Sequence, residues 1–488
     1  MAQPPRRHSS PAACRMSNVM QSSRLLSLTA SAFALVACAA VGPDHSPPLV
    51  PTAAQAKFIG TGYAGVSEAP VEDGWWRLYQ DPVLDGLVQQ ALAANKDLAI
   101  ATANIAVARA SLHGVRSDRL PQTRIGASAE YGRGSGLERT SDNDSELMLS
   151  TSLDVAYEVD LFGRVRRGIE AARADVDAAN AARHAVAVIV AAETTRAYGD
   201  ILATSRRLDV ANRTVALLEE TVRLANKRFQ AGRTSKLDLV RISALRDQQR
   251  ARIPELKSDL EAATFRLATL TGRPPAERPA IRTSGQLLQI AQPIPIGDGR
   301  ALLARRPDVR QAERRLAAST ARIGIATAEL YPRISLGGSV ASAATSIASL
   351  FSGGAVGFLL GPLINWSFPN QSAARARIAG AEAEAQGDLA RFDKSILTAL
   401  EETETALSRY ANEFERRSAL QSAVTQAQAA AQITRAQLRE GRADSLAVLD
   451  AERTLADTQA DIAEADARII DAQIDLFRAL GGGWQSGT

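Results

Sequence analysis

Residues 201–233 read ILATSRRLDVANRTVALLEETVRLANKRFQAGR. Apolar residues recur every seven positions in two interleaved series, which are Ile201, Leu208, Val215, Val222 and Phe229, and Ala211, Leu218 and Ala225. This heptad repeat is typical of helices that pack side by side as a coiled coil. No proline lies between Pro121 and Pro254. The pattern predicts one helix from about Arg164 to Phe229, which would extend about 100 Å at 1.5 Å per residue.

The stretch ends in Phe-Gln-Ala-Gly-Arg, where Gly232 predicts a tight turn. Apolar residues at helical spacing follow the turn, namely Leu239, Ile242, Ile253, Leu256, Leu260, Leu267 and Leu270. They predict a return helix that packs on the first. The sequence therefore predicts a helical hairpin much longer than a compact domain needs.

The hairpin occurs twice in the chain. The turn sequence at 229–233 has a counterpart, Leu-Arg-Glu-Gly-Arg, at 438–442, and the return helix continues at the same offset of 209 without a gap. Upstream, residues 97–121 match residues 308–332 at an offset of 211. Matches in register over this length indicate an internal duplication. The second hairpin is expected from about Ser372, with its turn at Gly441.

Each repeat also contains segments in which apolar and polar residues alternate. Residues 146–160 read ELMLSTSLDVAYEVD, and residues 124–131 alternate in the same way. In the second repeat, Val356, Phe358, Leu360, Ile364, Trp366 and Phe368 share one face of a strand. Alternation with a period of two predicts strands with one apolar and one polar face, as in membrane barrels. The expected β-hairpins span about 122–160 and 333–368.

The beginning of the chain carries export information. A short apolar run, Leu25–Ala37, follows Arg24 and leads directly to Cys38. Its length is that of a signal peptide, and Leu35–Cys38 resembles the bacterial lipobox, in which the cysteine thiol becomes lipidated. Ala39 follows the cysteine, which favours sorting to the outer membrane. An ordinary secretory signal is the alternative, and the start codon among Met1, Met16 and Met20 stays open.

The charge of the chain is explained by this leader. The net charge is +4, and four arginines but no acidic residue or lysine precede Cys38. The remaining chain carries 53 basic and 53 acidic residues and is formally neutral. The basic pI is therefore no argument for a nucleic-acid partner.

The strand count sets the expected oligomer. We expect no apolar run of about 18 residues after the leader, so that only a closed barrel of strands would cross a membrane. Known barrels start at about eight strands, and each chain contributes four. Three copies give twelve strands with room for a lumen. The fold class expected is therefore mainly α with a β-barrel part, trimerising into a 12-stranded β-barrel continuous with a 12-helix α-barrel.

The chain divides into a signal peptide (1–37), a lipidated extended segment (38–80), a first repeat (81–281), a linker (282–300), a second repeat (301–482) and a tail (483–488). The tips of the helical hairpins lie near 232 and 441.

Several motifs resemble one known family. They are Val41–Asp44 (VGPD), Pro47–Pro48, Trp75–Trp76, Asp81–Leu84 (DPVL), Tyr157–Gly163 (YEVDLFG) and Arg305–Val309 (RRPDV). Together with the lipobox and the duplication they resemble the TolC-type outer-membrane efflux factors, specifically the NodT-like lipoprotein branch. The similarity covers nearly all of the mature chain. It implies a homotrimeric duct in the outer membrane with a periplasmic helical tunnel. Such a duct passes small toxic compounds from an inner-membrane pump, commonly of the resistance-nodulation-division type, through a periplasmic adaptor.

The resemblance also implies functional residues. The tips, with Gly232 and Arg233 in one and Gly441 and Arg442 in the other, match the family's adaptor contacts. Two carboxylates match positions that help to close the periplasmic mouth, and by the repeat offset an arginine occupies the place of one of them. These gate candidates are Asp238, Asp450 and Arg241. Solvated charges at helix ends are the alternative. Leu438, Ala443 and Ala447 stand where well-known members carry polar latch residues, so any latch here is simpler or different.

Other functions fit the sequence less well. The histidines are separated, and no Ser-His-Asp order, paired cysteine or phosphate-binding loop is present, so we expect neither an enzyme nor a metal or cofactor beyond the lipid on Cys38. A duct for type I protein secretion shares the architecture and is the main alternative. A coiled-coil envelope lipoprotein without a pore is a weaker one, because it has no use for the alternating strands. The substrate, the pump and the adaptor are not specified by the sequence.

Overall fold

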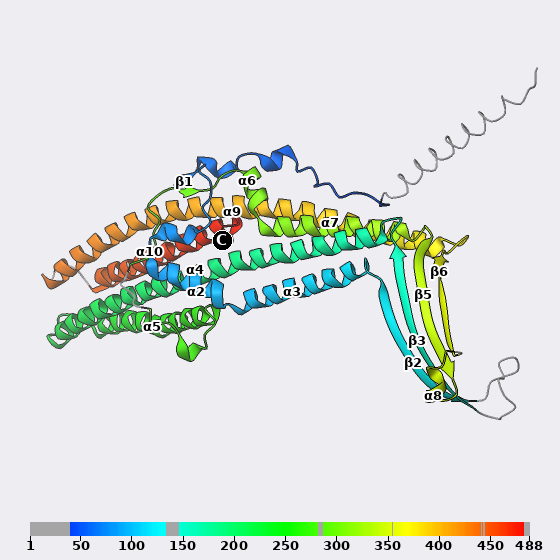
Figure 1. Ribbon diagram of the computed structural model, residues 1–488. Helices are drawn as coiled ribbons and strands as arrows, with labels where there is room; N and C mark the ends of the chain where they lie inside the picture. Colours follow the sequence, from blue (N-terminus) through cyan, green and yellow to red (C-terminus); the bar gives the residue numbers. More distant parts are fainter. Residues whose placement is uncertain are drawn as a thin grey trace, which may run out of the picture. The chain divides into compact units, whose positions relative to one another are not determined.

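A computed structural model describes residues 40–132, 146–281, 286–353, 355–440, 442 and 445–482 (Figure 1). The chain forms two compact units. The first comprises Met1–Ser46, Ala108–Val176 and Arg315–Leu389, and the second comprises Pro47–Val107, Asp177–Arg314 and Ala390–Thr488. These units differ from the sequence repeats, because the long helix of each repeat begins in the first unit and ends in the second.

Four long helices form the two predicted hairpins. They are α4 (Arg164–Gln230), α5 (Lys236–Leu270), α9 (Ser372–Arg439) and α10 (Ser445–Ala479). The first helices of the pairs have 67 and 68 residues, and both return helices have 35. The heptad positions Ile201, Leu218 and Ala225 are at most 2% exposed, as expected for a packed seam, whereas Phe229 near the tip is 37% exposed. The duplicated hairpin is therefore confirmed.

Shorter helices and turns precede, connect or follow the strands and the long helices. They are η1 (Thr52–Gln55), η2 (Ile59–Gly62), η3 (Trp75–Tyr79), α2 (Pro82–Ala94), α3 (Lys96–Ser117), η5 (Pro275–Glu277), α6 (Gly299–Arg305), α7 (Pro307–Ala328) and α8 (Ile347–Leu350). Two short strands, β1 (Val66–Ser67) and β4 (Ile294–Pro295), pair in parallel.

One helical stretch corrects an expectation. Pro82–Ser117, which comprises α2 and α3, contains an 18-residue window of mean hydropathy 1.3, of which 22% is buried. The expectation of no such run after the leader was wrong because many alanines raise the mean. The stretch is interrupted at Asn95, whose backbone is extended and whose side-chain oxygen accepts a hydrogen bond from the Asp97 amide at 2.8 Å. It is therefore two helices rather than one continuous apolar rod.

The first unit contains a four-stranded antiparallel sheet. Its strands are β2 (Gln122–Gly132), β3 (Glu146–Val159), β5 (Arg333–Ala344) and β6 (Val356–Asn365), in the order β2-β3-β5-β6. The last strand ends earlier than the expected hairpin, so Trp366 and Phe368 lie beyond it rather than in it. Their rings stack 4.7 Å apart, and the Trp366 indole donates to the Leu330 carbonyl.

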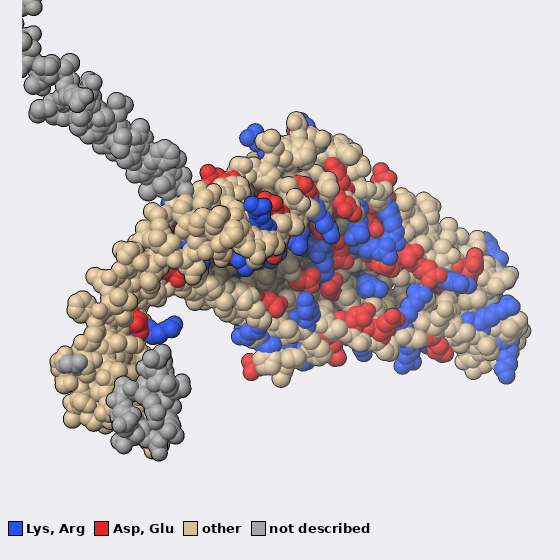
Figure 2. Space-filling view, turned by 90° about the vertical axis from the view of Figure 1, so that its right-hand side faces the viewer, with Lys and Arg blue, Asp and Glu red and all other residues tan. Residues whose placement is uncertain are grey.

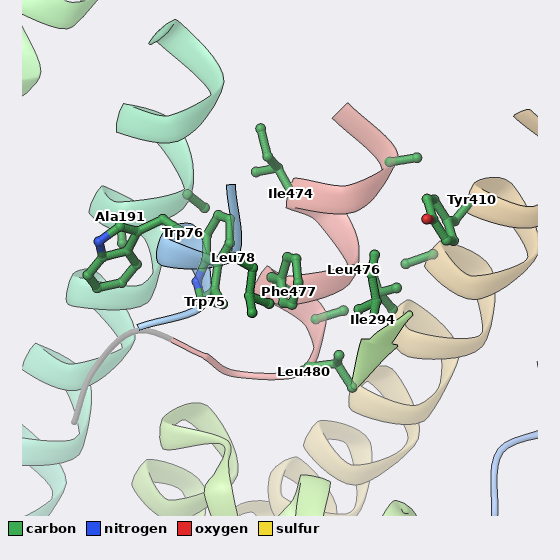
Figure 3. Close-up of a cluster of buried hydrophobic side chains, with 14 of the residues drawn as sticks. Trp75, Trp76, Leu78, Ala191, Ile294, Tyr410, Ile474, Leu476, Phe477 and Leu480 are labelled. Carbon is green, nitrogen blue, oxygen red and sulfur yellow. The ribbon is translucent and has the colours of Figure 1, made fainter. Parts of the chain in front are cut away.

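The core of the second unit is built around aromatic side chains (Figure 3). Trp75 is fully buried and stacks on Phe477 with ring centroids 4.7 Å apart, and Trp76 meets Trp75 edge to face. Aliphatic residues from α2, α5 and α10 complete the cluster, including Leu84, Leu267 and Ile474. Burial of this apolar area is what holds η3 and α2 against the long helices.

The Arg-Arg-Pro-Asp motif joins α6 and α7 to this core. Arg306 is 7% exposed and donates to both Asp308 carboxylate oxygens, at 2.9 and 2.6 Å, and to the Ala479 carbonyl at 2.9 Å. It also pairs with Glu402 at 2.8 Å. A buried guanidinium needs this full set of acceptors, so the motif fixes the C-terminal end of α10 in place.

Candidate functional site at the helical tips and the sheet

The first tip is a glycine turn. α4 ends in a pattern in which the amide of Arg233 donates to the Arg228 carbonyl at 2.8 Å and the amide of Gly232 to the Phe229 carbonyl at 2.9 Å. Gly232 has φ +67°, and a Cβ there would meet no atom within 4 Å. The glycine is thus required by backbone conformation and not by space, and the Arg233 side chain is exposed.

α5 begins with a reciprocal cap. The Ser235 hydroxyl accepts a hydrogen bond from the Asp238 amide, while the Asp238 carboxylate accepts from the Ser235 amide at 3.2 Å and from the hydroxyls of Ser235 and Thr234 at 2.8 and 2.9 Å. These bonds, first that of the Ser235 hydroxyl, lower the pKa of Asp238. One oxygen of the predicted gate carboxylate is therefore occupied by local capping.

The second tip repeats the geometry of the first. The Arg442 amide donates to the Gln437 carbonyl at 2.8 Å, at positions equivalent to Arg233 and Arg228. Arg442 is exposed, and its guanidinium lies 3.4 Å from the Glu440 carboxylate. Gly441 lies outside the described residues, as does Cys38.

The gate candidates lie on the two return helices. Arg241 is exposed on α5 one turn beyond Asp238, whose pKa its charge helps to lower. Asp450 is exposed on the first turns of α10. Among the described residues no ion pair joins Asp450 to Arg241 within one chain. Both side chains therefore point to solvent in the single chain.

A buried ion pair beside the second tip was missed by the sequence reasoning. Arg435 on α9 makes a two-pronged contact with Glu452 on α10, one bond of which is 2.7 Å long, and Glu452 is 4% exposed. The available signal was that Glu452 follows Val448 by four residues and precedes Leu455 by three, which is a seam position. A charged residue in a seam predicts a partner on the facing helix.

A second missed contact joins the two hairpins. The Arg228 guanidinium donates to the Leu438 carbonyl in the last turn of α9, where the helix dipole favours a cation. Beside it lies a groove of about 470 Å³. The groove is lined by Leu217, Glu220, Thr221, Arg223, Leu224, Lys227, Arg435, Leu438 and Arg439. Four basic residues face a single acidic one, so the groove is basic.

The sheet presents a continuous apolar face. One register row joins Ile125, Leu153, Val340 and Phe358 across the four strands, with exposed fractions of 79%, 43%, 48% and 85%. The neighbouring row on the other face contains Arg124, Asp154, Ser339 and Leu359. The predicted alternation is therefore confirmed, with the exception that β6 carries leucines on its second face. Figure 2 shows the sheet surface almost free of charged side chains.

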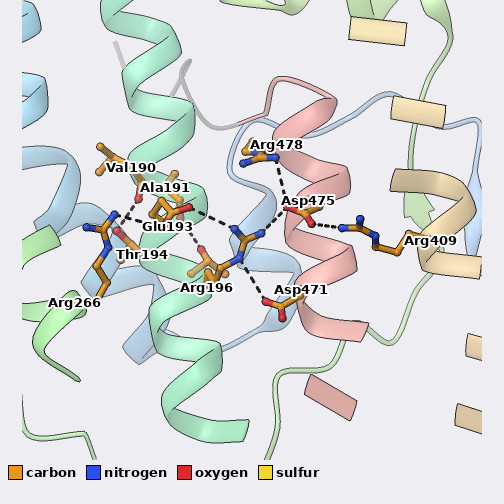
Figure 4. A network of polar contacts seen from close by, with 11 residues as sticks. Val190, Ala191, Glu193, Thr194, Arg196, Arg266, Arg409, Asp471, Asp475 and Arg478 are labelled. Atoms are coloured by element: carbon orange, nitrogen blue, oxygen red, sulfur yellow. Dashed lines mark hydrogen bonds and ion pairs between the residues drawn. The ribbon is translucent and has the colours of Figure 1, made fainter. Parts of the chain in front are cut away.

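A charged network crosses the second unit (Figure 4). Arg196 on α4 lies 2.6 Å from Asp475 and 3.4 Å from Asp471, both on α10, and Arg409 on α9 lies 3.2 Å from Asp475. Burial, and then the charge of Asp471, raises the pKa of Asp200 to about 6. Burial also raises the pKa of Asp471, against the effect of Arg196.

These features define a class of protein. An exposed apolar sheet face, open strand edges and long helical hairpins with small, capped turns are the properties of an outer-membrane channel with an extended helical part.

The comparisons with known proteins identify the family. The chain matches the family model for outer membrane efflux proteins at residues 87–273 and 299–482, and it belongs to this family. It is 29% identical to the probable efflux pump outer membrane protein TtgC of Pseudomonas putida, over 95% of this chain and 96% of that protein. It is 28% identical to Nodulation protein T of Rhizobium leguminosarum, over 91% and 94%. The solved structure of the outer-membrane channel OprN matches with a TM-score of 0.85 and 37% identity, over 91% of this chain and 99% of that chain.

The family assignment confirms the resemblance, the fold class and the location in the outer membrane. The chain is an efflux channel protein of the outer membrane.

Proposed function

We propose that three copies of the chain form the exit duct of a tripartite efflux pump, with a 12-stranded barrel in the membrane and a 12-helix tunnel in the periplasm. One observation carries the proposal. The sheet leaves β2 and β6 as unpaired edges and exposes an apolar face. In a membrane both edges must pair, and four strands are too few to enclose a lumen.

Two neighbouring positions on β5 test this directly. Val340→Glu places a charge on the apolar face, and Ser339→Glu places the same charge on the opposite face. An arginine or lysine that faces lipid costs about 2–4 kcal/mol near the midplane of the bilayer, and a glutamate costs less but is still unfavourable, so we expect Val340→Glu to lose trimers and conductance in planar bilayers. Ser339→Glu serves as the matched control and keeps both. Monomeric wild-type protein without conductance would overturn the proposal.

The tips are the proposed contacts for a periplasmic adaptor. The proposed contact residues are Gly232, Arg233, Gly441 and Arg442, of which Arg233 and Arg442 are exposed, and the groove near the ends of α4 and α9 is basic. We expect an adaptor helix with acidic residues to dock here, and an inner-membrane pump of the resistance-nodulation-division type to supply the cargo. Arg233→Glu combined with Arg442→Glu should abolish adaptor crosslinking. Arg173→Glu is the control, because Arg173 is exposed near the start of α4, more than 50 residues before the tip.

The gate proposal concerns the carboxylates and the arginine near the tips. Asp450 and Arg241 are exposed and therefore available to sister subunits, whereas Asp238 is engaged by its cap. A ring of three Asp450 carboxylates would disfavour anions and bind cations. Closed-state leakage should rise in Asp450→Ala and Arg241→Ala channels, and unchanged leakage in both would exclude the latch.

Cys38 is the proposed lipid attachment site, so that the chain is both anchored to and inserted in the outer membrane. Mass spectrometry of the mature N-terminus tests this, because acylation adds a defined mass that Cys38→Ala removes. The channel class supports a passive role without catalysis, metal or other cofactor, and without a nucleic-acid partner.

Small toxic compounds are the proposed cargo, in preference to secreted protein. The name of the TtgC relative, a probable efflux pump component, supports this choice. Deletion of the gene followed by toxicity profiling across compound classes tests it. Loss of a secreted protein without any change in compound tolerance would instead favour type I secretion. The exposed apolar sheet face argues against an envelope spacer without a pore.

A further inference from the structure

The proposed duct assigns no role to the Val-Gly-Pro-Asp motif near the N-terminus. In the structure, residues Ala40–Asp44, here called the strap, lie against the first unit. The Val41 amide donates to the Phe162 carbonyl at 3.1 Å, directly after β3. The strap is therefore bound where the sheet passes into α4.

Arg167, in the first turn of α4, holds the strap. Its guanidinium donates to the carbonyls of Val41 and Gly42, both at 3.2 Å, and to the Asp44 carboxylate at 2.7 Å. A further bond at 2.8 Å reaches Glu170 on the same helix. The Arg167 side chain is 4% exposed while that of Asp44 is 91% exposed. A buried guanidinium needs hydrogen-bond acceptors in place of water, and the strap supplies three of the four acceptors of Arg167.

Glycines make room for the strap on both sides. A Cβ on Gly324 of α7 would lie 2.9 Å from the Val41 carbonyl oxygen and 2.8 Å from Arg167 Cγ, and one on Gly163 would lie 2.5 Å from Ala40 Cβ. Gly42 itself has φ +87°, and its Cβ would lie 2.5 Å from Gly324 Cα. Glycines in the strap and in the segments that it contacts therefore both allow the two backbones to approach closely.

The position of the strap relates it to the sheet. Ala40 is two residues from Cys38, a separation that spans at most about 7 Å of extended chain. The binding point adjoins Phe162, whose ring stacks on Tyr331 at 4.5 Å. Aromatic rings at the ends of strands mark the membrane–water interface of barrels. The strap therefore ends beside the interfacial edge of the sheet.

We propose that Arg167 and the strap form a clamp that ties the acylated N-terminus to the end of the sheet, so that the acyl chains enter the membrane next to the barrel rim and assist barrel assembly. Arg167 is a positioning residue in this scheme. The inference rests on the proposed lipidation of Cys38, and it adds that the anchor acts through a defined protein contact and not as a free tether.

The first experiment measures whether Arg167 holds the strap. A nitroxide on Pro43→Cys, which is exposed, reports strap mobility in purified trimers, and the mass of the same protein shows whether Cys38 is acylated. We expect an immobilised spectrum in the parent, and a mobile one in Arg167→Gln and in Gly324→Ala. Arg173→Gln, an exposed position on the same helix, is the control and should stay immobilised. An immobilised strap in both Arg167→Gln and Gly324→Ala would overturn the clamp.

The second experiment separates anchoring from ordinary packing. Arg167→Gln and Gly324→Ala are each placed in the acylated protein and in a Cys38→Ala protein exported with a non-lipoprotein leader. We expect each variant to lower the yield of membrane trimers in the acylated background only, by about tenfold in Arg167→Gln, which loses the charge-assisted bond to Asp44. An equal loss in both backgrounds would show a packing role and refute the clamp. If the parent carries no lipid, the proposed anchor fails, while the spin-label result still decides whether Arg167 holds the strap.

Discussion

The two helical hairpins have nearly the same length, but they are held together differently. Among the described residues, four ion pairs join α9 to α10, namely Arg409–Asp475 at 3.2 Å, Arg417–Asp466 at 2.5 Å, Arg435–Glu452 at 2.7 Å and Arg468–Glu413 at 3.9 Å. In the part of the chain that the structure describes, one pair, Arg266–Glu193 at 3.5 Å, joins α4 to α5. The second hairpin is thus cross-linked along its length, whereas the first depends on its apolar seam.

The ion pairs between the helices differ in the two copies of the duplicated hairpin, whereas the apolar seam is retained. Positions equivalent to Arg409 and Asp475 are Asp200 and Arg266, so the signs are reversed. Arg266 pairs with Glu193 instead, and Asp200 is left near Asp471 with a raised pKa. Seam residues and turn glycines are fixed by geometry in both copies, while the charges between the helices have diverged.

The largest expected effect comes from breaking the buried pair of the second hairpin. Glu452→Gln leaves the Arg435 guanidinium without its counter-charge, which should destabilise the hairpin by about 3 kcal/mol. Hydrogen exchange of α9 and α10 near the tip measures it. The equivalent substitution in the first hairpin, Ser243→Ala, should change exchange little. Recovery of stability in Arg435→Met/Glu452→Leu would show that the loss comes from the unpaired charge.

The first hairpin contains a proline that the second lacks. Pro254 lies inside α5, where the equivalent residue in α10 is Ala463. A proline in a helix interior removes one backbone hydrogen bond and costs up to about 3 kcal/mol. Pro254→Ala should slow amide exchange in α5 by an amount equal to about 1–2 kcal/mol, and Ala463→Pro should weaken α10 by more. Unchanged exchange in Pro254→Ala would mean that the surrounding helices already compensate.

The partly buried carboxylate of Asp200 predicts that the stability of the protein depends on pH. Its pKa of about 6 lies above the ordinary value of 3.8, so the folded state retains a proton that the unfolded state releases. The stability contribution of this group is therefore present at pH below about 4 and is lost as the pH rises through 6. Asp200→Asn should raise stability by about 1 kcal/mol at pH 7.5, after allowance for partial solvent exposure, and by nothing at pH 3.5. Asp209→Asn, at a carboxylate on the same helix that pairs with Arg206 and Arg213, should show no such pH-dependent gain.

Much of the architecture was predictable because its signals are periodic. The heptads, the turn at Gly232 and the alternating strand residues each depend on local spacing, and they form the expected elements except that Trp366 and Phe368 lie beyond β6. The seam position of Glu452 predicts a partner on the facing helix but does not specify Arg435. Arg167 and Asp44 of the strap are 123 positions apart, and spacing does not reveal their contact. β6 ends at Asn365, and the indole of Trp366 beyond it donates to the Leu330 carbonyl. The alternation continues past this point and does not predict where the strand ends.

The smallest expected effect concerns the cap of the first tip, where the two hairpins carry different residues at the start of the return helix. The Ser235 hydroxyl and the Asp238 carboxylate satisfy amides at the start of α5, and the equivalent of Ser235 in the second tip is Asp444. Ser235→Ala should weaken the first turn of α5 by about 1 kcal/mol and move the pKa of Asp238 back toward its ordinary value. Ser235→Asp keeps an acceptor and should restore most of the loss. NMR titration of Asp238 and exchange at the α5 amides measure both changes. A loss of stability in Ser235→Ala that Ser235→Asp does not restore would contradict the capping role of Ser235. It would mean that the serine acts through the hydrogen bond that it donates to the Asp238 carboxylate. This local role of Asp238 would then be distinguished from its proposed role at the gate.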